Sequence, residues 1–163
     1  MRAVLVLAAL LALCGSALAD TPADAVRFFY TPPQFEPDPT FRNRFADPAK
    51  AVFDSNDKIS QTDEIGCIDF NLAADGQDFD DAEIVRTLEL KETINGGAAT
   101  VIATFSQFPQ GENSEDAPGK AVIVWSLKQV DGAWLISDIE SQTNDWKLSS
   151  FDCQPSNLSL IHI

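Results

Sequence analysis

The fold class of this chain rests mainly on residues 120–140, which read KAVIVWSLKQVDGAWLISDIE. Apolar residues alternate along 121–130 and occupy both faces near its centre, which is typical of an interior β-strand. Asp131 and Gly132 form a hairpin signal, because both residue types readily adopt positive backbone φ angles. Residues 133–140 are then predicted to return as the last strand of a sheet.

The same period of two extends toward the N-terminus. Residues 84–92 alternate in polarity, and Asn95-Gly96-Gly97 is a second tight-turn signal. Consecutive strands joined by short turns pair antiparallel, so we expect a four-stranded meander. Its predicted strands are residues 84–92, 99–108, 120–130 and 133–140.

Helical signals precede the strands. Thr21 and Pro22 begin a predicted helix that ends near Tyr30, where Pro32 and Pro33 forbid continuation. Two short helices are expected over 39–46 and 48–60, the second capped by Asp47, and one more over 144–151. Because helices and strands are segregated, we predict an α+β domain with N-terminal helices packed on a curved four-stranded antiparallel meander.

Residues 1–19 have the features of an export signal. An apolar run from Val4 to Cys14 is too short to cross a bilayer, and Ala17-Leu18-Ala19 is a small-residue cleavage site. Leu13, directly before Cys14, disfavours lipidation of that cysteine, but lipidation is kept as an alternative. We predict a periplasmic or secreted protein with no membrane insertion after signal removal, a single domain over 20–153, and a tail over 154–163.

The charge of the chain is strongly negative. There are 25 acidic and 11 basic residues, a formal net charge of -14, and loss of the signal removes one basic residue only. Such acidity excludes nucleic-acid binding through a basic patch. It favours basic partners, and it equally well serves the solubility of an exported protein.

Removal of residues 1–19 leaves two cysteines, Cys67 and Cys153. Thiols of exported proteins are usually paired, so we predict a disulfide between them. A redox-active pair would stand close in sequence as Cys-x-x-Cys, which these do not. The predicted role of the bridge is therefore structural.

Three segments carry a resemblance to a bacterial family of exported proteins of unknown function, within the nuclear transport factor 2-like, or cystatin-like cone, superfamily. They are residues 66–71 (GCIDFN), 75–79 (DGQDF) and 131–139 (DGAWLISDI). The resemblance covers about 20–153, and this chain has Asn71 where relatives tend to carry Asp. It implies a cone-shaped α+β fold and a homodimer through the sheet. It implies no agreed activity.

A polar cluster between residues 69 and 81 is the main candidate binding site. The candidate residues are Asp69, Asn71, Asp75 and Asp78. As a calcium loop the run fails, because Ala73 and Ala74 stand where a ligand and a glycine belong, and no metal is predicted. The alternative is that these side chains brace a long loop through hydrogen bonds to its backbone.

Candidate catalytic residues are few. Enzymes of the superfamily often place a carboxylate and a Tyr or His inside the cone, and here only Asp138 and Tyr30 are available as weak candidates. Asp138 is expected on the same side of its strand as Trp134 and Ile136. The alternative for Tyr30 is a core aromatic residue, and the alternative for Asp138 is a solvated carboxylate at the end of a strand. The one histidine, His162, lies in a tail whose ending resembles translated sequencing-adapter sequence. A non-native tail is therefore one of the alternatives, and the tail is assigned no function.

The sequence therefore favours a non-catalytic periplasmic binding domain without a cofactor. It would recognise a protein or a small ligand through the concave face of the sheet or the acidic loop. Two alternatives remain open: an isomerase- or dehydratase-like enzyme with an apolar pocket, and an inhibitor or immunity protein whose acidity blocks a cationic site.

Overall fold

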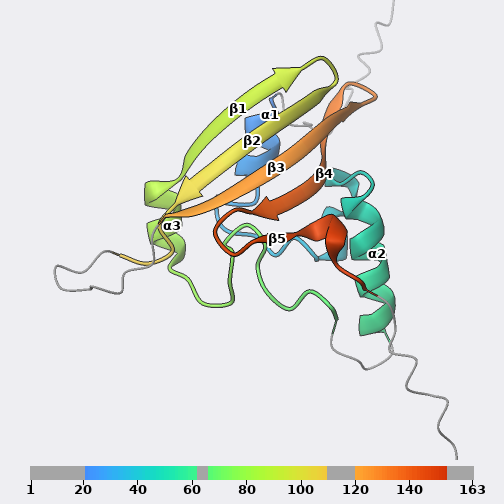
Figure 1. The fold of residues 1–163 in the computed structure, drawn as a ribbon, viewed down its shortest axis with the longest axis horizontal. Coiled ribbons are helices and arrows are strands. Elements are labelled where there is room, and N and C mark those ends of the chain that lie inside the picture. The colour runs from blue at the N-terminus through green and yellow to red at the C-terminus, as the bar shows by residue number, and fades with distance from the viewer. Residues whose placement is uncertain (1–20, 62–65, 110–119, 154–163) are drawn as a thin grey trace, which may run out of the picture.

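The computed structural model describes residues 21–61, 66–109 and 120–153. The predicted signal peptide and the predicted tail both lie outside the described residues. Within them the elements follow one another as shown in Figure 1. They are α1 (Pro22–Arg27), the 3-10 helix η1 (Pro39–Arg44), α2 (Ala49–Ser60), α3 (Asp81–Thr87), β1 (Glu89–Asn95), β2 (Ala98–Phe105), β3 (Ala121–Val130), β4 (Ala133–Ser141), β5 (Trp146–Lys147) and the 3-10 helix η2 (Leu148–Ser150).

The strands form one antiparallel sheet in the order β1-β2-β3-β4-β5. The predicted α+β class and meander are confirmed, but the sheet has five strands rather than four. The helix expected over 144–151 is wrong: β5 pairs with Glu140 and Ser141, and η2 follows it. Pairing at the edge of β4 satisfies backbone groups that a helix there would have left open.

The strand predicted from residue 84 is also wrong at its beginning. Residues 81–87 form α3, and β1 starts at Glu89. The Asp80 carboxylate accepts a hydrogen bond from the Glu83 N–H, which caps the helix. Ile84 is fully buried and Leu88 is half-buried. A spacing of four residues places two side chains on one face both in a helix and in a strand, so this pattern does not distinguish the two.

Aromatic side chains fill the helix-covered face of the sheet. Phe29 and Tyr30, just after α1, are fully buried, and the Phe29 ring stacks on Trp125 of β3 at 5.6 Å between centroids. Thr21 caps α1 as predicted, whereas α2 has no side-chain cap from Asp47. Figure 1 shows α1 behind β2 and β3, and α2 beside the β4 edge. Packing on this face therefore forms the hydrophobic core between the helices and the sheet.

No helix in residues 21–61, 66–109 or 120–153 is long and apolar enough to cross a membrane.

Candidate functional site

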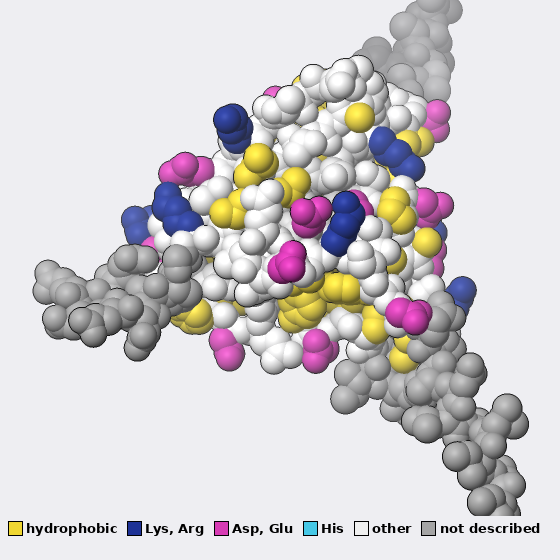
Figure 2. All heavy atoms as spheres, in the orientation of Figure 1, with side chains coloured by type: hydrophobic (Ala, Val, Ile, Leu, Met, Phe, Trp, Pro, Cys, Tyr) yellow, Lys and Arg dark blue, Asp and Glu magenta, His cyan; other side chains and the backbone are white. Residues whose placement is uncertain are grey.

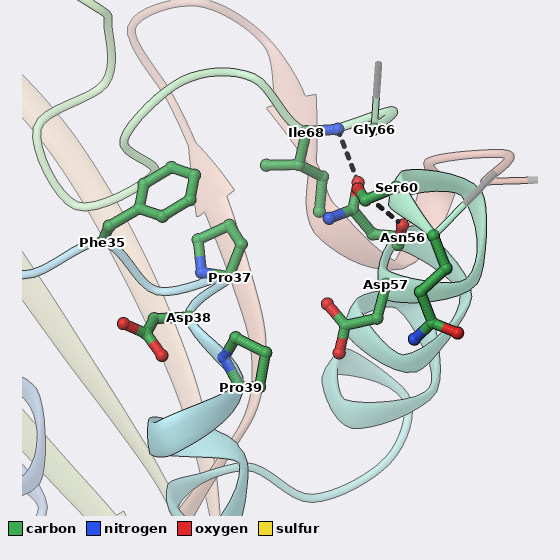
Figure 3. A pocket seen from close by; sticks show the side chains of 10 residues that line it. Phe35, Pro37, Asp38, Pro39, Asn56, Asp57, Ser60, Gly66 and Ile68 are labelled. Atoms are coloured by element: carbon green, nitrogen blue, oxygen red, sulfur yellow. Dashed lines mark hydrogen bonds between the residues drawn. The ribbon is translucent and has the colours of Figure 1, made fainter. Parts of the chain in front are cut away.

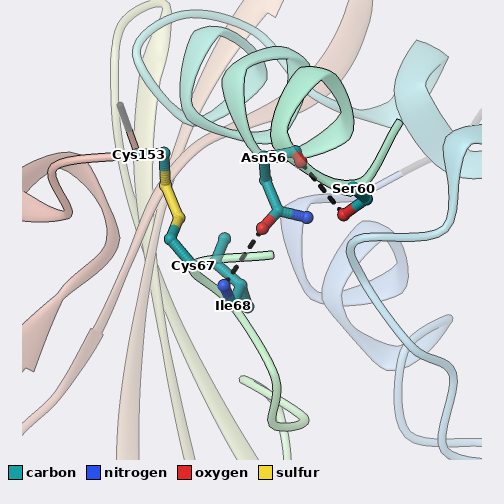
Figure 4. Close-up of a disulfide and its surroundings, with 5 residues drawn as sticks. All are labelled: Asn56, Ser60, Cys67, Ile68 and Cys153. Atoms are coloured by element: carbon teal, nitrogen blue, oxygen red, sulfur yellow. Dashed lines mark hydrogen bonds between the residues drawn. A yellow bond between two sulfur atoms is a disulfide. The ribbon is translucent and has the colours of Figure 1, made fainter. Parts of the chain in front are cut away.

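The acidic loop, residues 66–80, is an irregular segment held by a disulfide and several hydrogen bonds. At its start, Cys67 and Cys153 form the predicted disulfide, with 5.4 Å between their Cα atoms (Figure 4). Beside it, the Ile68 N–H donates to Asn56 Oδ1 at 3.0 Å. The bridge and this hydrogen bond tie the loop to the segment after η2 and to α2.

Asn71 holds a turn in the middle of the loop. Its Oδ1 accepts from the Ala74 N–H at 2.7 Å, and its Nδ2 donates to the Gln34 carbonyl at 2.8 Å. Asn71 and Gly76 also exchange two backbone hydrogen bonds. Both polar ends of the Asn71 side chain are thus engaged, as the bracing alternative describes for this residue.

Glu36 is a buried carboxylate that sequence reasoning missed. Its side chain is fully buried, and its two oxygens accept hydrogen bonds from the N–H groups of Leu72 and Ala73, at 3.0 and 2.9 Å. Burial raises the pKa of this carboxyl group to about 7, against the lowering effect of the hydrogen bonds. Glu36 lies in the Pro-rich connector, where no periodic pattern marks a residue as buried.

Asp75 joins the turn to the sheet. One carboxylate oxygen accepts from Ser141 Oγ at 2.8 Å and the other from Trp146 Nε1 at 2.7 Å. The residue is 5% exposed and has a φ of 61°, which Asp tolerates better than most side chains. A carboxylate so enclosed fixes the loop against β4 and β5 and has no free oxygen to offer a ligand.

Asp69 and Asp78 behave differently, because both are exposed. Within the described ranges neither carboxylate forms an ion pair. Asp69 lies on a hollow of about 440 Å³, which we call the loop pocket. Its apolar walls are Pro33, Phe35, Phe70 and Phe79, and its acidic side chains are Asp69 and Asp81.

A second hollow, of about 620 Å³, shares the Phe35 side chain with the loop pocket. Figure 3 shows Phe35 and the connector prolines on one wall and the end of α2 on the other. Phe35 is 46% exposed. Figure 2 shows hydrophobic side chains gathered between β5 and the acidic loop, with acidic side chains beside them. Exposed aromatic and acidic groups thus coincide around this loop.

The two candidate catalytic residues do not converge. Tyr30 is buried, and its hydroxyl accepts from Trp125 Nε1 at 3.2 Å. A bulge between Ser126 and Leu127 shifts the register of β4, so that Asp138 pairs with Ser126, on the face opposite Trp125. The expectation that Asp138 shares a side with Ile136 is therefore wrong.

Each of these side chains has a structural partner instead. Asp138 Oδ1 accepts from the Ser149 N–H at 3.1 Å, and Oδ2 lies 3.5 Å from Lys147 Nζ. Burial raises the pKa of Tyr30 well above its ordinary value, which keeps the phenol neutral. The hydrogen bonds of the two side chains therefore go to different elements, that of Tyr30 to Trp125 of β3 and that of Asp138 to Ser149 of η2.

The part of the chain that the structure describes holds no group of three or more His, Cys, Asp and Glu side chains placed to bind a metal ion.

Comparison of the sequence with protein families and with curated proteins finds no match. Among solved structures, the fold is similar to a chain in the crystal structure of the type VI native effector-immunity complex Tae3-Tai3 from Ralstonia pickettii. The TM-score is 0.50 at 17% sequence identity, and the match covers 76% of this chain and 96% of that chain. This likeness supports the mixed helix and antiparallel-sheet architecture.

Proposed function

We propose that this chain is a protein-binding inhibitor of the immunity type, which recognises its partner through the acidic loop. The observation that carries the proposal is the fold likeness to a chain from an effector-immunity complex, because that chain is matched over 96% of its length. Two proteins bound to each other define such a complex, so the likeness favours a protein partner over a small ligand.

The location of the charge supports the same proposal. The chain carries a net charge of -14, and Asp69 and Asp78 of the acidic loop are exposed without ion pairs in the described ranges. Unpaired carboxylates on a rigid loop attract a basic protein surface and accelerate its association. On the helix-covered face, by contrast, Phe29, Tyr30 and Trp125 are fully buried.

Other features of the proposal come from the sequence. The predicted export signal and the Cys67–Cys153 bridge favour the periplasm or the extracellular space as the place of action. A homodimer through the sheet and the detailed nuclear transport factor 2-like cone stay predictions. We do not propose the isomerase-like alternative, because Asp138 and Tyr30 lie on opposite faces.

The test is reconstitution of a complex from two purified proteins. The oxidised chain would be immobilised and exposed to secreted and periplasmic proteins of its source, and a retained protein would be identified and produced separately. A 1:1 complex that weakens steeply with salt, and in which the partner loses its toxicity or enzymatic activity, is expected. A retained protein that binds without losing activity, or saturable binding of a small molecule alone, would contradict the proposal.

A further inference from the structure

The loop pocket has three aromatic side chains in its wall, of which Phe35 is exposed while Phe70 also packs against Trp146 and Phe151. Phe35 comes from the connector, whereas Phe70 and Phe79 come from the two ends of the acidic loop. Phe35 is 46% exposed, and Phe70 and Phe79 are half-buried. Ring faces carry partial negative charge and attract cations, most strongly where water is excluded.

Two carboxylates complete the pocket. Asp69 and Asp81 line it together with the rings, both are exposed, and neither is ion-paired in the described ranges. No Lys, Arg or His stands among the pocket's lining residues. Its charge is therefore uncompensated locally, in a chain that is strongly acidic overall.

The pocket is also preformed. Asn71, Gly76 and Gln77 are among its lining residues. The backbone exchange between Asn71 and Gly76 fixes the turn, and Gln77 Nε2 donates to the Asp69 carbonyl at 3.2 Å. A preformed pocket loses little conformational entropy when a ligand enters, so modest contacts are enough for binding.

We propose that the loop pocket receives an arginine side chain of the protein partner. The inference rests on the proposed function and names the chemistry of its contact. A guanidinium is planar, so it stacks on the rings, and its five N–H donors can reach carboxylates at the same time. A lysine ammonium supplies the charge without the planar stacking surface.

The test needs no partner. The ¹⁵N-labelled, oxidised protein is titrated with acetyl-arginine methylamide, with the acetyl-lysine analogue, and with the citrulline analogue, which is isosteric with arginine but neutral. We expect saturable shifts of the Gly76 and Gln77 signals with arginine, at a Kd of about 1–10 mM. Lysine should bind about threefold more weakly and citrulline about tenfold more weakly.

Matched variants assign the site. Asp69→Asn with Asp81→Asn should weaken arginine binding about tenfold, and Phe35→Leu about threefold. The control pair is Asp131→Asn with Asp145→Asn, which removes the same charge at two exposed turn positions outside the pocket and should leave the Kd unchanged. Thermal unfolding of each variant verifies that the fold is intact.

Three outcomes would overturn the inference: no saturable shift at the pocket, equal binding of the citrulline analogue, or equal weakening by the control pair. Each is independent of whether a protein partner is captured. Failure here would leave the inhibitor proposal standing on its reconstitution experiment. Failure of that reconstitution would leave the arginine titration valid as a property of the pocket.

Discussion

The sheet core and the acidic loop lie side by side but are stabilised in different ways. Apolar packing dominates in the core, where Phe29 stacks on Trp125 and both are fully buried. The acidic loop is held by a disulfide, by the Asn71 side-chain amide and by two buried carboxylates. These carboxylates, Glu36 and Asp75, each accept two hydrogen bonds. Loss of one contact is therefore expected to destabilise the whole sheet in the core but only the local segment in the loop.

Nonspecific apolar packing is insensitive to pH and oxidation state, whereas the contacts of the loop respond to both. The loop also carries the exposed Asp69 and the half-buried rings of Phe70 and Phe79 that line the loop pocket. If the two regions are separable, the loop can change in sequence without loss of the sheet. The experiments below test whether the two regions are as separable as this comparison requires.

Truncation in the core should have the largest effect. Phe29→Ala removes a fully buried ring that contacts Phe28, Phe41, Phe45 and Trp125. We expect a loss of about 4 kcal/mol in the free energy of unfolding, measured by urea denaturation, because the cavity cannot fully collapse. The near-ultraviolet circular dichroism of Trp125 should change as well. A loss below about 1 kcal/mol would show that the ring does not support the sheet.

Removal of the disulfide should approach the same magnitude but act on the loop. Cys67→Ser with Cys153→Ser removes a cross-link between residues 86 positions apart, and chain entropy gives an upper figure of about 4.5 kcal/mol. At low urea, amides of residues 66–71 should exchange with solvent faster while those of β2 and β3 stay protected. Equal acceleration in both regions would contradict the separation.

The third prediction concerns pH. The pKa of Glu36 is raised in the folded state, so the folded chain holds this proton more tightly than the unfolded chain does. The proton on Glu36 therefore stabilises the folded state fully below pH 4.5. This stabilisation, about 3 kcal/mol in the free energy of unfolding, is lost as pH rises through about 7.

Glu36→Gln isolates that contribution, because the amide does not titrate. The difference in unfolding free energy between the native chain and the variant should change by about 3 kcal/mol between pH 4.5 and pH values above about 7, and the variant should gain relative stability at high pH. Urea denaturation at a series of pH values measures it. A difference that does not vary with pH would contradict the assignment of a raised pKa to Glu36.

The smallest effect is expected at Gly66. A Cβ there would lie 2.5 Å from Asn56 Oδ1, the atom that accepts from the Ile68 N–H. Gly66→Ala should therefore cost about 1–2 kcal/mol and loosen the start of the loop. Gly97→Ala is the control, because nothing lies within 4 Å of its added Cβ. Equal stability of the two variants would show that Asn56 can move aside without cost.

Several local features were readable from the residue pattern. The hairpin signal at Asp131 and Gly132, the cap at Thr21 and the pairing of Cys67 with Cys153 are all found in the structure. Each depends on neighbouring residues or on the number of cysteines. The residue pattern predicts the start of β1 wrongly although Asp80 and Glu83 carry a capping signal, because helical and alternating periods coincide over so short a segment.

The candidate site was readable only in part. Asp69 does line a pocket, as a polar residue on a long loop suggests, but Asp75 lies buried against Ser141 and Trp146. Identical side chains six residues apart thus have opposite environments. Whether a carboxylate faces solvent or the sheet depends on residues some 70 positions away, which no local pattern contains.

Composition and local pattern were enough for the α+β class, the meander and the disulfide, because alternation, turn chemistry and cysteine number act over short stretches or over the whole chain. Tertiary structure alone decided the burial of Glu36, the bulge that turns Asp138 away from the core, and the meeting of Phe35 with Phe70 and Phe79. Those features arise from packing between segments distant in sequence, where one residue of register or one turn reverses the face that a side chain presents.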